Sequence, residues 1–308
     1  MNITLRKIIF VSCILFCLLP FMDAPFALLL GFFFSQLIEH PFKKQNSKVL
    51  KYLLQISIVG LGFGMNLNTA FEAGKEGLVF TIISIATTLL LGFALGKLFG
   101  LDKKVTVLLS SGTAICGGSA IAAVGPVIEA EDSQMSIALG AVFILNSVAL
   151  FLFPWIGHLL NLNQHQFGLW AAIAIHDTSS VVGAAHQFGD EALSIATTVK
   201  LERALWIIPL TLIFSNVFKS NKGKVNVPLF ILFYVAAMAI NTYLPSTQIA
   251  TSLITLIARK GLIITLFLVG AGLSRDALRK VGAKPFVAAV LLWIFISVMS
   301  LLVITHTA

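Results

Sequence analysis

The chain has 308 residues, of which 58% are hydrophobic and 11% are charged, against roughly 25% charged residues in an ordinary soluble domain. This composition excludes an ordinary soluble protein and predicts a chain that lies in a lipid bilayer. The formal net charge is +8, which by itself would suit a nucleic-acid partner, so the positions of the charges have to decide its meaning.

A membrane-spanning helix needs about 20 mostly apolar residues, and this length predicts eleven spans. In chain order they cover residues 7–22, 24–40, 49–68, 77–99, 105–129, 134–160, 165–189, 191–217, 227–244, 259–273 and 284–304. Residues 246–258 are predicted to form an interfacial or half-length helix before the tenth span. We therefore predict an all-α polytopic membrane protein with about 11 transmembrane helices, forming one integral membrane domain over residues 1–308.

The basic residues of the connections fall almost entirely on one side of the predicted membrane. With the N-terminus in the cytoplasm, fourteen of them are internal and one to three are external. This positive-inside pattern predicts a cytoplasmic N-terminus and an external C-terminus, and it accounts for the net charge without a nucleic-acid partner. The internal residues are Arg6, Lys7, Lys43, Lys44, Lys48, Lys103, Lys104, Lys219, Lys222, Lys224, Arg275, Arg279, Lys280 and Lys284, while the acidic residues Glu129, Glu131, Asp190 and Glu191 are predicted to be external.

A short motif occurs twice in the chain. VGLGF at residues 59–63 returns as VGAGL at residues 269–273, each followed by a polar connection and a long apolar span. The charge assignment gives the two copies opposite directions, which predicts an inverted repeat relating residues 49–100 to 259–304, a common plan of secondary transporters. The alternative interpretation is that small residues recur here only for close helix packing.

The first core motif is the fifth span, residues 105–129, which contains the run SGTAICGGSAIAAVGP and is rich in small residues. A helix that breaks near Gly118 would direct free N–H groups and a positive dipole end at the middle of the membrane, which suits an anion. Thr113, Gly117, Gly118 and Ser119 are therefore candidate substrate-binding residues in a discontinuous helix near the midplane. Close packing through Gly112, Cys116 and Ala120 is the competing interpretation.

The second core motif covers residues 165–217 and brings charge into two apolar spans. His176 and Asp177 lie in the middle of one span, and Lys200 and Arg203 share a face of the next. Because a charge at this depth is costly, three interpretations remain open. The charges, including Glu202, form a buried ion-pair network; or Lys200 and Arg203 bind an anion; or His176, Asp177 and Glu202 couple transport to a proton or another ion.

These motifs together resemble one family. The run LLSSGTAICGGSAIAAVGPVIEA (108–130), followed by IHDTSSVVGAA (175–185) and VKLERALWIIP (199–209), is similar to the YeiH-type family named as sulfate exporters. The resemblance implies a bacterial inner-membrane protein related to the bile acid/sodium symporter and sodium/proton antiporter superfamily. It also implies a fold with inverted repeats and two helices broken near the midplane, and dimers are common among such relatives.

From these observations we predict a secondary active transporter that exports a small anion by alternating access. The expected anion is a sulfate-like or sulfite-like oxyanion or a sulfonate. The alternative is a cation/proton antiporter on the same fold, with Asp177 as the carrier. No Walker motif, G-x-S-x-G or H-E-x-x-H occurs, so neither ATP hydrolysis nor an intramembrane enzyme is expected. The three cysteines, Cys13, Cys17 and Cys116, lack metal-ligand spacing, and no cofactor is predicted.

Overall fold

The structure is a computed structural model, and it describes residues 3–20, 22, 24–38, 40–218, 229–244, 248–272 and 281–307. All the secondary structure in these residues is helical. The sequence predicts one domain over residues 1–308. The structure divides the chain into two compact units. Unit 1 comprises residues 1–71 and 228–275, and unit 2 comprises residues 72–227 and 276–308.

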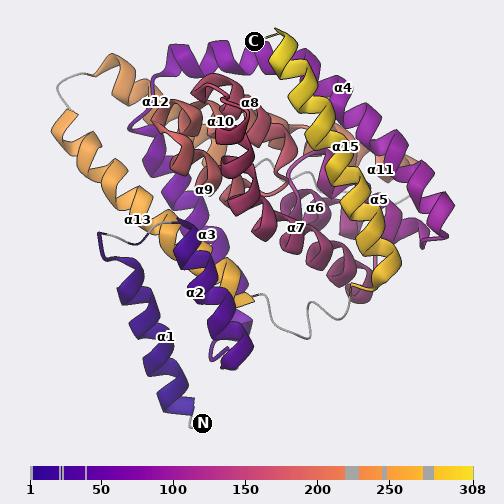
Figure 1. The fold of residues 1–308 in the computed structure, drawn as a ribbon, viewed down its shortest axis with the longest axis horizontal. Coiled ribbons are helices and arrows are strands. Elements are labelled where there is room, and N and C mark those ends of the chain that lie inside the picture. Colours follow the sequence, from indigo (N-terminus) through magenta and orange to yellow (C-terminus); the bar gives the residue numbers. More distant parts are fainter. Residues whose placement is uncertain are drawn as a thin grey trace. The chain divides into compact units, whose positions relative to one another are not determined.

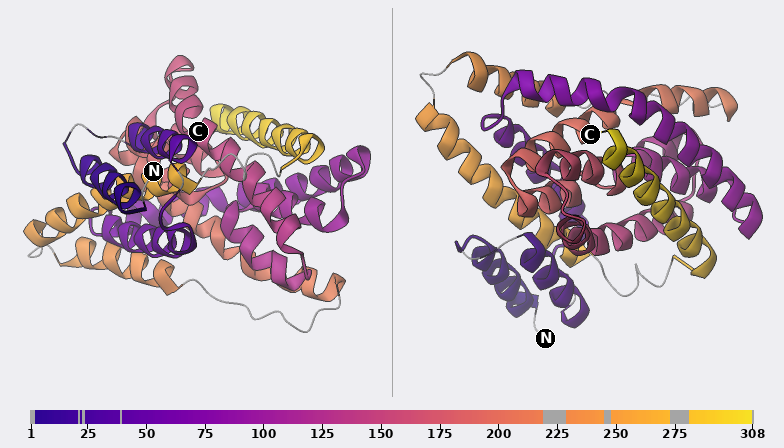
Figure 2. Two further views of the ribbon diagram at one scale, coloured as in Figure 1. Left: turned by 90° about the horizontal axis from the view of Figure 1, so that it is seen from below. Right: turned by 45° about the horizontal axis from the view of Figure 1, so that its top comes forward.

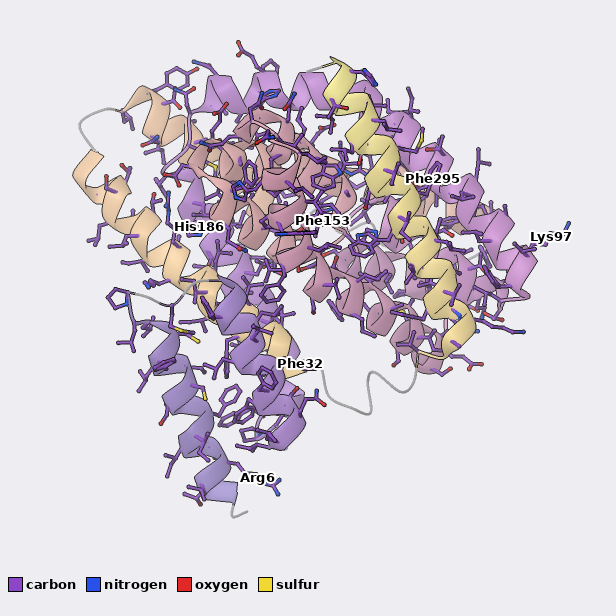
Figure 3. The ribbon with its side chains drawn as sticks, viewed as in Figure 1. Arg6, Phe32, Lys97, Phe153, His186 and Phe295 are labelled. Atoms are coloured by element: carbon purple, nitrogen blue, oxygen red, sulfur yellow. The ribbon has the colours of Figure 1, made fainter. Side chains whose placement is uncertain are left out.

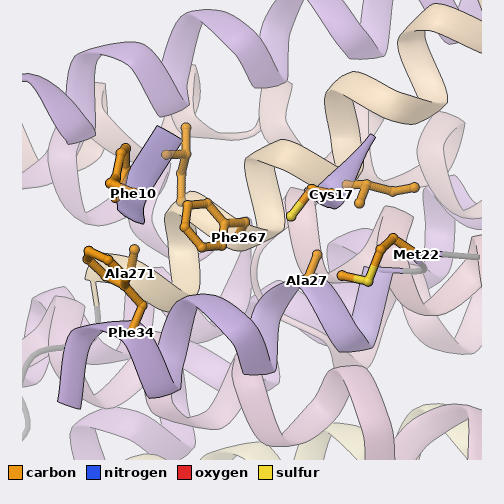
Figure 4. Packing of buried hydrophobic residues seen from close by; sticks show 9 residues of the cluster. Phe10, Cys17, Met22, Ala27, Phe34, Phe267 and Ala271 are labelled. Atoms are coloured by element: carbon orange, nitrogen blue, oxygen red, sulfur yellow. The ribbon is translucent and has the colours of Figure 1, made fainter. Parts of the chain in front are cut away.

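Unit 1 is a bundle of helices built around α13 (Figure 1). Helix α13 packs against α2 and α3, and α12 packs against α3. Ring contacts join Phe10, Phe34 and Phe267 at the centre of a buried apolar cluster (Figure 4). The helices of this unit are α1 (Ile3–Cys17), α2 (Ala24–Leu37), α3 (Lys43–Gly62), α12 (Leu229–Tyr243) and α13 (Gln248–Gly272).

Two glycines let the backbones of α2 and α13 touch. A Cβ atom added at Gly31 would overlap the carbonyl oxygen of Phe267, and one added at Gly270 would overlap that of Leu28. Close approach through small residues is the usual way in which helices associate in a membrane.

The glycines of the two recurring motifs lie at the ends of α3 and α13. The inverted repeat of 49–100 and 259–304 stays a prediction.

Unit 2 contains the two core motifs. Its helices are α4 (Leu67–Phe99, which belongs to this unit from Glu72), α5 (Lys103–Ala114), α6 (Gly118–Val127), α7 (Asp132–Leu159), α8 (Gln164–Ala174), α9 (Thr178–Phe188), α10 (Asp190–Leu205), α11 (Ile207–Val217) and α15 (Ala283–Thr307). Helix α15, yellow in Figure 2, packs against α5, α7 and α8. Phe153 of α7 stacks on Trp170 of α8 inside this unit, whereas Lys97 projects from the end of α4 (Figure 3).

The length and composition of the helices fit a membrane protein. Four helical stretches are long and apolar enough to cross a bilayer: Phe80–Phe99, Ser133–Leu159, Ala250–Gly272 and Ala283–His306. Shorter apolar helices cover Phe26–Leu37, Gly118–Val127 and Leu229–Tyr243. The total of about 11 spans stays a prediction.

Two predicted boundaries were wrong. Residues 248–272 form the single helix α13, so 246–258 does not contain a separate half-length helix within its described part. The predicted span 191–217 is instead two helices, α10 and α11, which meet at Trp206. Pro209 lies three residues after this break, and a proline has no N–H group to donate to the carbonyl oxygen four residues before it.

Candidate functional site

Helices α5 and α6 form a hairpin whose two ends lie together. The side chain of Lys104, at the start of α5, donates a hydrogen bond of 2.6 Å to the backbone oxygen of Glu129, just beyond α6. Gln134 donates to Asp102, the N-cap residue of α5, at 2.9 Å. A straight helix over this stretch would separate Lys104 from Glu129 by roughly 37 Å at 1.5 Å per residue. The chain therefore turns back at residues 115–117, between the two helices.

Helices α8 and α9 form a second hairpin of the same kind. The side-chain oxygen of Gln164, the first residue of α8, accepts hydrogen bonds from the backbone N–H groups of Glu191 and Ala192, which follow α9. The rings of Phe167 and Phe188 stack with their centroids 3.8 Å apart, close to this end. The chain turns back at residues 175–177.

The two hairpins enter from opposite ends of α7 and meet near its middle. The open end of the first lies at the start of α7, and the open end of the second follows the end of α7. At the first turn, Gly117 lies close to Val142 of α7 and to the backbone of His176 in the second turn. Figure 1 shows α5 beside α6 and α8 beside α9. The molecule thus has two opposed re-entrant hairpins whose turns are in contact.

This geometry corrects two predicted spans. Residues 105–129 and 165–189 are long enough to cross a membrane, but each folds back so that its two ends lie together. Glu129 lies at the same end as Lys104, so their prediction on opposite sides was wrong. The predicted helix break near Gly118 is confirmed, since α6 begins at that residue. Non-helical backbone at this depth is tolerated because other protein groups surround it.

We expect labelling of single cysteines to show the same arrangement. In a chain with Cys13, Cys17 and Cys116 replaced by serine, a cysteine at Lys103 and one at Glu131 are expected to react with an impermeant maleimide from one side of the membrane. A cysteine at Asn161 and one at Asp190 are expected to react only from the other side. Labelling of positions 103 and 131 from opposite sides would contradict the hairpin.

The turns of the two hairpins align position by position, and three of the six residues are identical. The first reads Ala-Ile-Cys-Gly-Gly-Ser over 114–119, and the second reads Ala-Ile-His-Asp-Thr-Ser over 174–179. In both, one helix ends at the alanine, the isoleucine is its C-cap, and the next helix begins four residues after the alanine. Gly117 and Asp177 therefore occupy equivalent N-cap positions. The sequence analysis missed this similarity between the two turns.

Two buried cations lie at the C-terminal ends of α5 and α8. The ammonium group of Lys200 donates to the carbonyl oxygens of Ile115 at 3.1 Å, Ala172 at 3.1 Å and Ile175 at 2.7 Å. Arg203 donates to the carbonyl oxygen of Ala114 at 2.5 Å and to the Ser84 hydroxyl of α4 at 2.8 Å. Both side chains are 0% exposed. The predicted shared face is confirmed, and the positive charges complement the negative ends of two helix dipoles.

Asp177 caps the N-terminus of α9. Its carboxylate accepts hydrogen bonds from the backbone N–H groups of Ser179 at 3.0 Å and Ser180 at 3.4 Å, and from the Ser179 hydroxyl. An aspartate in this position satisfies free helix N–H groups and suits the positive end of the dipole. In the part of the chain that the structure describes, Asp177 forms no ion pair with Lys200 or Arg203, which argues against the first of the three interpretations, the ion-pair network.

Asn146, in the middle of α7, holds the second turn in place. Its side-chain oxygen accepts hydrogen bonds from the backbone N–H groups of His176 at 3.1 Å and Asp177 at 3.2 Å. Its amide nitrogen is buried and has no hydrogen-bond partner among the described residues. The sequence analysis missed this residue, although a single asparagine inside the apolar span 134–160 was a usable signal.

Several other polar atoms around the turns are buried without a described partner. They include the Thr113 hydroxyl in the last turn of α5 and both ring nitrogens of His176. The N-cap residue of α6, Gly117, makes no side-chain hydrogen bond. In the first turn of α6, Gly118 is partly exposed and Ser119 is exposed. Glu202 lies on a less buried face of α10, and its two carboxylate oxygens are covered but unpaired in the described residues.

The arrangement therefore gathers most of the predicted residues in one region. Gly117 and His176 are in contact, Lys200 bridges both turns, and Arg203 contacts the end of α5. Glu202, next to Arg203 in α10, is less buried than its neighbours Leu201 and Arg203. Among the described residues, no group of three histidine, cysteine or acidic side chains could hold a metal ion.

Comparisons with known proteins agree on the class of protein. Residues 11–289 match the model of a family described as "Conserved hypothetical protein 698". The chain is 56% identical over 280 residues to a "UPF0324 membrane protein" of Bacteroides thetaiotaomicron, covering 90% of this chain and 84% of the relative. Proteins of the same name from Porphyromonas gingivalis and Shewanella oneidensis are 52% and 49% identical, covering 91% and 98% of this chain and 86% and 95% of the relatives. No solved structure matches the chain.

Proposed function

This chain belongs to the membrane-protein family described as "Conserved hypothetical protein 698", and from that premise we propose that it is a secondary active transporter of a small anion. The cargo class is a sulfate-like or sulfite-like oxyanion or a sulfonate, moved outward by alternating access. The protein lies in a bacterial inner membrane as a multi-pass protein, with its N-terminus in the cytoplasm and its C-terminus outside. Its partners are the anion, a coupling ion, the lipid bilayer and, as a homodimer, a second copy of the chain.

The observation that carries this proposal is the difference between the two matched turns. In the second hairpin, the carboxylate of Asp177 occupies the N-terminus of α9. In the first, the equivalent residue is Gly117, which has no side chain to cap α6. A free helix N-terminus attracts an anion because its N–H groups and dipole are positive. The cargo would therefore take the position at α6 that the Asp177 carboxylate takes at α9.

Polar groups near the first turn supply further donors for such an anion. Thr113 has a buried hydroxyl, Asn146 a buried amide N–H₂ and His176 a ring whose neutral form has one N–H donor, all without a described partner. Donors that converge on a mostly apolar site fix the orientation of a ligand. Gly118 and Ser119 add backbone N–H groups at the start of α6, and the exposure of Ser119 gives the anion access to them.

The charged residues have different roles in this proposal. Lys200 and Arg203 already donate to helix carbonyl groups, so they attract the anion by their charge at a distance rather than by direct hydrogen bonds. His176 and Glu202 have unpaired buried atoms and couple transport to a proton, while Asp177 keeps the second turn folded. Opposed hairpins that meet inside the protein suit alternating access, because each can open toward one side of the membrane.

The thermal stability of the purified protein tests this function. We expect sulfate, sulfite, thiosulfate or a small sulfonate to raise the unfolding midpoint, since a ligand that binds only the folded state stabilises it by about 2.7 kcal/mol at 100 times its Kd. Chloride serves as the anion control. A shift with sodium alone would instead support a cation/proton antiporter. Gly118→Leu places a side chain against Phe143 and Leu139 and is expected to abolish the anion shift in a folded protein.

A further inference from the structure

The Lys200 side chain carries a buried charge, and it also joins the ends of two helices. Its ammonium group lies where two interrupted helices present their free carbonyl oxygens to each other. The last carbonyl groups of a helix have no partner inside that helix. In membrane transporters built on interrupted helices, such carbonyl groups form the sites that coordinate a monovalent cation.

Lys200 satisfies this set of carbonyl oxygens completely. An ammonium group has three N–H donors and no acceptor, and here the three donors meet three oxygens, from Ile115 of the first turn and from Ala172 and Ile175 of the second. The side chain is 0% exposed. A buried cation is costly unless its hydrogen bonds and neighbouring charges compensate for the lost water, and the carbonyl groups of two helix ends do so.

We propose that the Lys200 ammonium group is a covalently attached substitute for a monovalent metal cation, joining the two hairpins so that the folded protein needs no bound sodium or potassium. The site is a three-carbonyl cation site, filled by the protein itself. Arg203 has the same role at the neighbouring carbonyl oxygen of Ala114, where it donates at 2.5 Å. The two hairpin turns are therefore held together by a charge that is part of the chain and cannot dissociate from it.

This inference makes a distinct prediction for the loss of the side chain. Lys200→Ala leaves the three carbonyl oxygens facing a space that a small cation fits. We expect this variant to have a lower unfolding midpoint than the unchanged protein. Methylammonium, sodium or potassium chloride is expected to raise that midpoint with increasing concentration, whereas choline chloride, whose cation is too large, is not. The unchanged protein is expected to show none of these cation-specific shifts.

Two variants separate this proposal from a general loss of stability. Lys200→Met fills the space with an uncharged side chain of similar length, so we expect a lower midpoint that no cation restores. Lys260→Ala removes a lysine that donates to one carbonyl oxygen, that of Leu19, at an exposed position, and we expect no cation-specific effect there. A folded Lys200→Ala protein that no small cation stabilises, or a Lys200→Met protein as stable as the unchanged one, would overturn the proposal.

If the Lys200 variants do not fold, the unfolding midpoint of the protein without substitutions tests the proposal. A midpoint that is equal in sodium, potassium and choline chloride supports the proposal, and a specific requirement for sodium or potassium contradicts it. The only part that rests on the proposed function is the expectation that anion transport into liposomes continues without sodium. Because the stability measurements need no cargo, a failure to transport any anion would leave their result intact.

Discussion

Gly117→Ala is expected to stop transport and to destabilise the first hairpin turn. Gly117 has φ +61° and ψ −120°, a backbone conformation that a residue with a Cβ atom adopts only with strain of about 1–3 kcal/mol. The new Cβ atom would also lie 3.1 Å from Val142 and 3.3 Å from the backbone of His176. We expect transport into liposomes to fall to background and the unfolding midpoint to decrease.

Gly100→Ala is the matched control for this substitution. Gly100 has a similar φ of +63°, but nothing lies within 4 Å of the position that its Cβ atom would take. We expect this variant to lose some stability through backbone strain and to keep its transport rate. Equal transport by the two variants would show that the contact between the hairpin turns does not matter for function.

Asn146→Ala is expected to have a comparably large effect through the second hairpin. The substitution removes the acceptor of the backbone N–H groups of His176 and Asp177. Leaving a buried donor without a partner costs about 1–3 kcal/mol for each group. We therefore expect a clear decrease in the unfolding free energy, measured by thermal or denaturant unfolding in detergent, together with a loss of transport.

Asn146→Asp separates the two roles of this side chain, which are to accept hydrogen bonds from the second turn and to donate to the anion. It keeps an oxygen for both N–H groups but replaces the unpaired amide nitrogen with a second, negatively charged oxygen. We expect a protein that folds and binds the anion much more weakly. Ser147→Ala is the neighbouring control, because that hydroxyl donates only to Phe143 within α7, and it should leave both properties unchanged. Unaltered anion affinity in Asn146→Asp would remove Asn146 from the proposed site.

Local chemistry in the sequence predicted much of the candidate site. The small residues around Gly117 and Gly118 indicated a helix break where α5 and α6 separate. The spacing of Lys200 and Arg203 placed both cations on one buried face of α10. These predictions depend on residues within a few positions of one another, and glycine content and helical periodicity report such short-range features directly.

The partners of these residues could not be predicted in the same way. Asp177 looked like a counter-charge for the two cations, but its carboxylate caps α9, and the cations donate to backbone carbonyl groups instead. Every residue carries a backbone carbonyl group, so no sequence pattern marks the ones that receive a lysine. Asn146 was missed for a related reason, since its partners are backbone N–H groups 30 and 31 residues away.

By itself, the sequence determined that the protein is helical and lies in a membrane, because the bilayer requires long apolar segments and these can be counted. Only the tertiary structure decided that residues 105–129 and 165–189 turn back instead of crossing. A stretch of about 25 apolar residues fits either a span or two shorter helices. The deciding contacts, Lys104 with Glu129 and Gln164 with Glu191, join residues 25 and 27 positions apart. Such contacts depend on where the turn folds the chain, which hydropathy does not encode.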